Sequence, residues 1–123
     1  MIRSKELLEL LLTDDAERKR ERVIAQCVRL KRDVVAEDEQ DFGERQILNF
    51  GHTLGHAIER EMNYKLFHGD CVAIGMAIMT RALVRDGRCP ESCEKILEKL
   101  LKKYQLPNNT ELPSERILAA ARA

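Results

Sequence analysis

The residues best suited to carry chemistry fall in one short segment, from Arg45 to Glu59. Four polar residues in it recur at steps of four, three and four positions: Arg45, Asn49, His52 and His56. On one continuous helix these steps place the four side chains on the same side. A cation, an amide and two imidazoles on one stripe differ from the apolar seam by which helices pack into a core. We therefore expect this stripe to face a polar ligand.

The histidines are candidates for a metal site. His52 and His56 lie one turn apart and could bind zinc together, although a helical HxxxH pair without the glutamate of HExxH is also typical of structural or solvated histidines. The third histidine, His68, opens the next expected helix, and a turn can bring it back to the same face. Asp70 or Glu59 could add a carboxylate ligand, but both are also typical of helix ends and surfaces. The residues alone leave these alternatives open.

Two weaker candidates lie outside the segment. Lys31 belongs to the basic run Arg29–Arg32 near the end of a long expected helix. Such a run is often a solvated face beside the helix C-terminus; alternatively, Lys31 and Arg45 grip a phosphate or carboxylate group. Cys89 and Cys93, one turn apart, could join a histidine in a zinc site, for which their spacing is weak evidence.

Two glycines lie on the stripe beside the polar one. Gly51 and Gly55 are four residues apart, and each costs a helix about 1 kcal/mol relative to alanine. We expect them to permit close approach by another helix or a ligand.

Composition excludes several classes of protein. The chain has 123 residues, enough for one domain over 1–123, and its 21 basic and 21 acidic residues give zero net charge. No global field therefore draws it to nucleic acid or an anionic membrane. The longest apolar run, Cys71–Met79, is too short to span a bilayer, and the N-terminal residues lack the apolar core of a signal peptide. We expect a cytoplasmic protein with free thiols and no nucleic-acid or membrane partner.

The elements that must position these groups are helices. Only three prolines and six glycines interrupt a composition that favours helix. The expected fold is an all-α, multi-helical domain of about six helices, with an acidic connector over 37–43. The first expected helix is Lys5–Leu12, capped by Ser4, and the second follows the cap Thr13–Asp15 and ends at about Ala36. The other expected helices run from Glu44 to about Glu61, from about His68 to Arg85, from Pro90 to near Tyr104, and over a short last stretch from Ser114.

A longer pattern resembles the signature of the 3-dehydroquinate synthase family. Its centre reads GERQILNFGHTLGHAIE (residues 43–59), and HGDCVAIGM (residues 68–76) follows. Other positions that fit are Lys31, Val34–Val35, Asp38–Glu39, Tyr64, Leu66 and Leu106–Pro107. The resemblance covers most of the chain. It is also specific, because a generic helix pattern does not contain an arginine, an asparagine and two histidines at this spacing, followed by a third histidine twelve residues later.

The resemblance implies an activity and its cofactors. The family is a carbon–oxygen lyase that converts 3-deoxy-arabino-heptulosonate 7-phosphate, a phosphorylated sugar acid, to 3-dehydroquinate and phosphate in the shikimate pathway of aromatic amino acid biosynthesis. Bound NAD supplies a transient oxidation, and Zn²⁺ (or Co²⁺) grips two substrate hydroxyls.

The resemblance also implies a role for each residue of the site. His52 and His68 correspond to zinc ligands. The residues that correspond to contacts with substrate oxygens are Lys31, Arg45, Asn49 and His56, of which Lys31 and His56 are expected to act in catalysis. His56 is then a substrate contact or proton-transfer group and not the partner of His52 on zinc.

Other parts of such an enzyme are expected outside this chain. The family's full chain is about three times longer, as two domains require, and its N-terminal α/β half binds NAD. The third zinc ligand, a glutamate, lies upstream of Lys31 and beyond Met1. We expect a homodimer at full length and an inactive chain in isolation. The alternatives are the same domain of a related sugar-phosphate cyclase (a 2-deoxy-scyllo-inosose or valiolone-type synthase) and a non-catalytic helical module.

Overall fold

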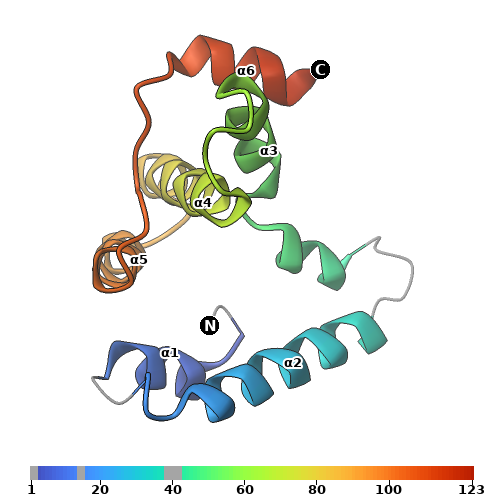
Figure 1. Cartoon of the computed structure of the whole chain (residues 1–123), viewed down its shortest axis with the longest axis vertical. Coiled ribbons are helices and arrows are strands. Elements are labelled where there is room, and N and C mark those ends of the chain that lie inside the picture. Colours follow the sequence, from blue (N-terminus) through green and yellow to red (C-terminus); the bar gives the residue numbers. More distant parts are fainter. Residues whose placement is uncertain (1–2, 14–15, 38–42) are drawn as a thin grey trace. The chain divides into compact units, whose positions relative to one another are not determined.

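The computed structural model describes residues 3–13, 16–37 and 43–123, without the side chains of Glu44 and Arg45. The expected cap at Asp14–Asp15 and most of the acidic connector lie outside the described residues. Within those residues all regular structure is helical (Figure 1). The elements are α1 (Lys5–Leu12), α2 (Arg20–Glu37), the 3₁₀ helix η1 (Glu44–Asn49), α3 (His52–Glu61), α4 (His68–Arg85), α5 (Glu91–Lys103) and α6 (Ser114–Arg122). The predicted all-α fold with six helical segments is confirmed.

The chain divides into two compact units, residues 1–48 and residues 49–123. In the first unit α1 packs on α2; in the second, α3 packs on α4 and α6, and α5 packs on α4. That both units together form one metal- and substrate-binding domain over 1–123 stays a prediction.

The core of the second unit lies where α3, α4 and α6 meet. Its buried members are Ala57, Ile58, Cys71, Ile74 and Ile117. Burying one large aliphatic side chain contributes about 1.5–3 kcal/mol to folding. The core therefore gives this unit a stable packing of its own.

Helix α4 is the central element of that core. Residues on several sides of it are buried: Cys71, Ala73, Ile74, Gly75, Ala77 and Thr80. This confirms the expectation, drawn from its apolar first half, of a buried central helix. Neither α4 nor any other helix of the described residues has the length and apolar character that crossing a membrane requires.

Three glycines let α3 and α4 approach closely. A β-carbon on Gly75 would lie 2.2 Å from the carbonyl oxygen of Gly51 and 2.9 Å from the nitrogen of Gly55. A β-carbon on Gly55 would lie 3.0 Å from the Cα of Val72. The backbones can be this close only because the side chains are hydrogen atoms. The expected use of Gly51 and Gly55 in close approach is confirmed, and the approaching element is α4.

The predicted helix from Glu44 to Glu61 is wrong in one respect, because the structure breaks it in two. The 3₁₀ helix η1 ends at Asn49, and α3 begins at His52. Between them Gly51 has φ +83°, a left-handed conformation that glycine adopts readily and that ends the regular register. The single polar stripe expected from Arg45 onward is therefore interrupted before the histidines.

The start of α2 also differs from the prediction. The helix begins at Arg20, and the residues before it, 16–19, form turns. The start of α1 is as predicted: the Ser4 hydroxyl accepts a hydrogen bond from the Leu7 backbone N–H at 3.1 Å and caps the helix.

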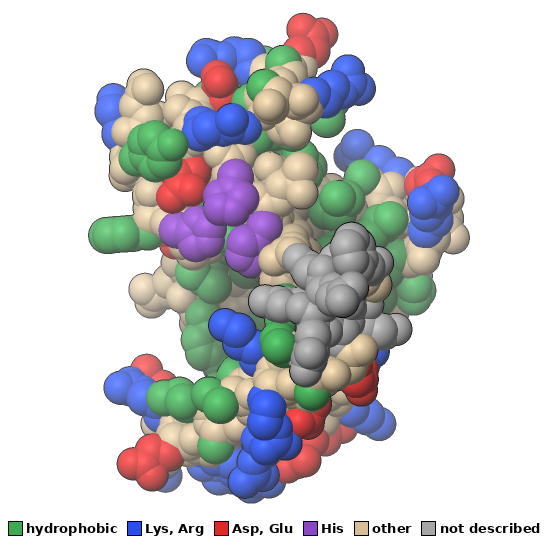
Figure 2. All heavy atoms as spheres, turned by 90° about the vertical axis from the view of Figure 1, so that its right-hand side faces the viewer, with side chains coloured by type: hydrophobic (Ala, Val, Ile, Leu, Met, Phe, Trp, Pro, Cys, Tyr) green, Lys and Arg blue, Asp and Glu red, His purple; other side chains and the backbone are tan. Residues whose placement is uncertain are grey.

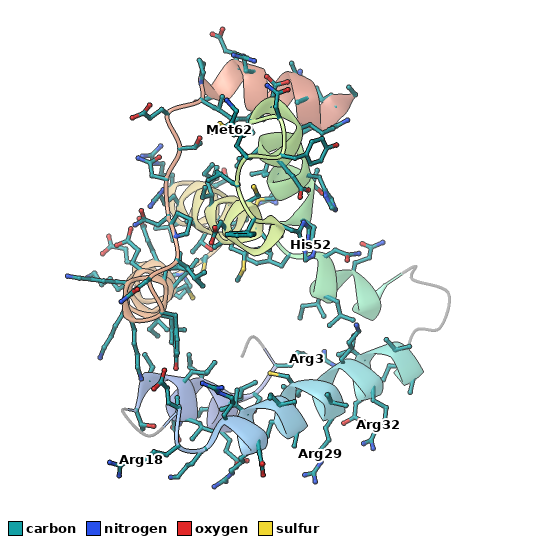
Figure 3. All side chains as sticks on the ribbon, in the orientation of Figure 1. Arg3, Arg18, Arg29, Arg32, His52 and Met62 are labelled. Carbon is teal, nitrogen blue, oxygen red and sulfur yellow. The ribbon has the colours of Figure 1, made fainter. Side chains whose placement is uncertain are left out.

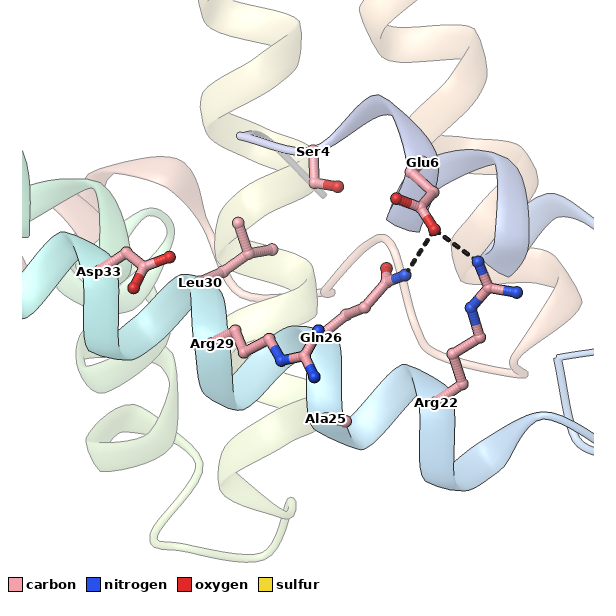
Figure 4. A pocket seen from close by; sticks show the side chains of 8 residues that line it. All are labelled: Ser4, Glu6, Arg22, Ala25, Gln26, Arg29, Leu30 and Asp33. Atoms are coloured by element: carbon pink, nitrogen blue, oxygen red, sulfur yellow. Dashed lines mark hydrogen bonds and ion pairs between the residues drawn. The ribbon is translucent and has the colours of Figure 1, made fainter.

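The first unit has a polar groove between α1 and α2. Figure 4 shows Glu6 accepting hydrogen bonds there from Arg22 at 2.6 Å and from Gln26 at 2.9 Å. Arg29 and Arg32 project from α2 into solvent (Figure 3). On this side α1 and α2 are thus joined by an ion pair and a neutral hydrogen bond to the same carboxylate.

Candidate metal and substrate site

The three histidines come together in the second unit. His52 and His56 lie on the first turns of α3, and His68 is the first residue of α4. Their ring centroids are separated by 5.9 Å (His52–His56), 5.6 Å (His52–His68) and 5.2 Å (His56–His68). Figure 2 shows the histidine side chains as one continuous patch on the surface.

The glycine contacts explain this convergence. Gly51 and Gly55 fix the first turn of α3 against Val72 and Gly75 of α4. His68 precedes Val72 by four residues, about one turn of helix. The contact that packs the two helices therefore also brings His68 beside the imidazoles of α3.

Glu59 lies between two of the imidazoles. Its Oε2 is 3.5 Å from Nδ1 of His56 and 3.4 Å from Nδ1 of His68. The carboxylate is the less exposed partner, at 17% against 57% for the His56 side chain and 49% for His68. One ligand atom from each of the three residues lies within 4.8 Å of the other two, and imidazole nitrogen with carboxylate oxygen is a donor set that zinc accepts.

His52 contributes a nitrogen of a different kind. Its Nδ1 is buried and has no hydrogen-bond partner among the described residues. Buried polar atoms are nearly always satisfied, so this nitrogen is suited to a group that arrives from outside the chain. The histidine cluster therefore fits a metal ion, and which imidazoles bind it stays a prediction.

The structure says less about the residues that were predicted to contact the substrate. Lys31 is exposed on α2 in the first unit, and Asn49 is exposed at the end of η1. The backbone of Arg45 belongs to η1, and its side chain lies outside the described residues. The structure thus brings together His52, His56 and His68, whereas the roles of Lys31, Arg45 and Asn49 remain predictions.

The other metal candidates receive less support. Within the described residues, the group of three side chains placed to hold a metal ion is His56, Glu59 and His68, and neither the predicted ligand His52 nor Asp70, Cys89 or Cys93 is part of it. The cysteine pair is in contact, and the hydrogen bond between the two side chains raises the pKa of the Cys89 thiol. All four cysteines are free thiols, as expected.

A buried thiol lies close to the cluster. Burial raises the pKa of Cys71, and the negative charges of Glu59 and Asp70 raise it further. A raised pKa keeps the thiol protonated at neutral pH, where it acts as a small apolar core group.

Comparison of the sequence with known proteins identifies a family and its relatives. The 3-dehydroquinate synthase C-terminal family matches residues 1–123. Relatives named 3-dehydroquinate synthase include one from Clostridium acetobutylicum, 48% identical over 103 residues, which are 82% of this chain and 29% of that protein. Another, from Clostridium perfringens strain 13, is 43% identical over 119 residues, which are 93% of this chain and 33% of the relative. A third, from Dehalococcoides mccartyi strain CBDB1, is 40% identical over 126 aligned residues, which are 97% of this chain and 35% of the relative.

The chain spans about a third of the length of these relatives. The family match nevertheless includes every described residue of the histidine cluster and the glycine contacts that position it. On this evidence the chain belongs to the 3-dehydroquinate synthase C-terminal family.

Proposed function

We propose that this chain is the helical metal- and substrate-binding part of a 3-dehydroquinate synthase. The observation that carries the proposal is the convergence of His52, His56 and His68 from two helices. Nearby, Glu59 supplies a carboxylate, and His52 offers an unpartnered buried nitrogen. A purely structural module has no need of three imidazoles gathered on its surface, which argues against a non-catalytic role.

Each residue has a chemically suitable task in this proposal. His52 and His68 hold a zinc ion, which when bound acts as a Lewis acid on substrate oxygens. His56, with more than half of its side chain exposed, can exchange a proton with a substrate oxygen. Lys31 and Arg45 pair with anionic groups of the substrate, and Asn49 hydrogen-bonds to its hydroxyls.

The remaining parts of the enzyme lie outside the described site. We assign NAD binding and the third, glutamate ligand of zinc to the portion of the longer relatives that this chain does not match. The implied partners are 3-deoxy-arabino-heptulosonate 7-phosphate, that NAD-binding portion and a second copy in a homodimer. Holding cofactor, metal and substrate in one geometry can supply about 7–11 kcal/mol, so we expect no turnover from the 123 residues alone.

A chimera tests the proposal. In it, this chain replaces the matching segment of the Clostridium acetobutylicum relative, and phosphate release from 3-deoxy-arabino-heptulosonate 7-phosphate is measured. We expect release by the chimera and none by the isolated chain. The changes His52→Ala, His56→Ala and Lys31→Ala should each lower turnover about 100-fold or more, whereas Lys95→Ala, at an exposed position on α5, should not. Turnover that survives His52→Ala with its zinc retained would contradict the assignment.

A further inference from the structure

The cluster contains one residue whose role neither the metal nor the substrate assignment explains. We propose that Glu59 is a positioning residue that holds His56 and His68 with the hydrogen on Nδ1, so that Nε2 of both rings is free. The use of those free nitrogens by metal and substrate rests on the proposed function, whereas the two contacts with Glu59, a hydrogen bond to His68 and an ion-pair contact to His56, do not.

A single carboxylate oxygen of Glu59 faces both imidazole rings. Oε2 of Glu59 is 3.4 Å from Nδ1 of His68 and 3.5 Å from Nδ1 of His56. An ionised carboxylate can only accept hydrogen bonds, so the hydrogen of each contact must come from the imidazole. A neutral imidazole carries one N–H, and placing it on Nδ1 leaves a lone pair on Nε2.

Burial supports this direction of the contacts. The Glu59 side chain is on the inner side of the group and is mostly covered, while both rings are about half exposed. Glu59 stands three residues after His56, on the same face of α3, and directly follows Ile58, which is fully buried. The carboxylate is therefore mostly covered, and it can hold the two more exposed rings.

His52 provides a contrast within the same cluster. It is part of the ring contacts with His56 and His68, but its buried Nδ1 has no hydrogen-bond partner among the described residues. Glu59 therefore orients two of the three imidazoles and makes no hydrogen bond with Nδ1 of the third. A variant at Glu59 should change two histidines and spare the other.

The alternative role for Glu59 is that of a direct metal ligand. The two roles differ in the nitrogen that each ring offers to an ion: beside a direct ligand the nearest ring nitrogens are the Nδ1 atoms, whereas a positioning residue holds hydrogens on Nδ1 and leaves Nε2. Orientation of metal-binding imidazoles through their second nitrogen is common, and loss of such a contact typically weakens metal binding about 10–100-fold.

The experiment is nitrogen-15 NMR of the histidine side chains in the metal-free 123-residue chain at pH 8, above the ordinary imidazole pKa of about 6.5. The spectrum of the wild-type chain already tests the proposal without any variant. We expect His56 and His68 to carry the hydrogen on Nδ1, and a finding of Nε2–H in both would overturn the proposal. Glu59→Ala should move both toward the Nε2–H form that free histidine favours and leave His52 unchanged. Glu59→Gln, whose amide oxygen can still accept a hydrogen bond, should keep part of the preference for hydrogen on Nδ1.

The matched control is Glu61→Ala on the same helix, because Glu61 pairs with Arg116 and not with a histidine. It should leave all three imidazoles as in the wild type, and tautomers that respond equally to both variants would overturn the proposal. Zinc titration of the same samples separates the two hypotheses. If the histidine tautomers depend on Glu59 but the chain binds no zinc, the proposed metal site alone is contradicted. If the chain binds zinc but the tautomers do not change in the Glu59 variants, this inference alone is contradicted.

Discussion

Helices α2 and α4 have the same length, 18 residues each, but are stabilised in different ways. Helix α4 buries six residues, whereas α2 buries only Val34 and exposes Ile24 to 55% and Val28 to 62%. Tertiary packing supplies most of the stability of helices in proteins. The second unit therefore positions its functional groups by packing, while the first presents Lys31 on a helix with little packing of its own.

The ion pairs of the first unit do not compensate for this difference. Arg22 pairs with Glu6 at 2.6 Å, and Arg3 pairs with Glu37 at 2.8 Å, all with largely exposed side chains. Exposed ion pairs contribute little to stability because water and salt screen them. We therefore expect the first unit to open more readily than the second.

The largest expected effect is a difference in thiol reactivity between the two units. Cys27 is exposed on α2, whereas Cys71 is buried on α4 and its raised pKa keeps it protonated. Alkylation with iodoacetamide at pH 8, followed by mass spectrometry, should modify Cys27 about 100-fold faster or more, because Cys71 must wait for the core to open. Equal rates would show that the core of the second unit is open.

The next effect concerns the close contact between α3 and α4. Gly75→Ala forces a β-carbon against the backbone of α3 and should destabilise the chain by about 1–3 kcal/mol, as overpacking does. The matched control is Gly69→Ala on the same helix, where a β-carbon meets nothing within 4 Å. Urea unfolding should show a loss for Gly75→Ala and none for Gly69→Ala. Equal midpoints would mean that the glycine contact does not hold the helices together.

The smallest effect is expected from the ionic groove of the first unit. Hydrogen bonds from Arg22 and Gln26 lower the pKa of Glu6. A carboxylate with a lowered pKa in the folded state stabilises that state above its unfolded pKa, and the contribution is lost as the pH falls through the folded value. The protection factors of the α1 amides, which are corrected for the intrinsic pH dependence of exchange, should therefore fall slightly in acid, and Glu6→Gln should reduce that pH dependence. An unchanged pH profile in Glu6→Gln would exclude the carboxylate as its source.

The sequence predicted the helices where it carries unambiguous end signals. The Ser4 cap sets the start of α1, and α4 has the predicted bounds, His68–Arg85. The break at Gly51 was not predicted, because glycine four residues from another glycine fits a close helix contact as well as a left-handed turn. Only the approach of α4 decides between them, and a local pattern does not contain that information.

The site was predictable to a similar extent. The spacing of His52 and His56, and a turn that returns His68, suggested a cluster that the structure does form. Glu59 could be named only as one possible ligand, because its contact with His68 joins α3 to α4 and follows from packing. A spacing of three residues from His56 was the one signal in the sequence that pointed to it.

The central claim is that the histidine cluster of the second unit binds a metal ion. Its most direct test is a zinc titration of the 123-residue chain, followed through the imidazole NMR signals of His52, His56 and His68. With fewer protein ligands than a closed tetrahedral site, we predict weak but saturable binding that shifts the three signals together and is lost in His52→Ala and in His68→Ala. Two results would contradict the claim: imidazole signals that do not respond to zinc, or zinc binding that is as strong in both variants as in the wild-type chain.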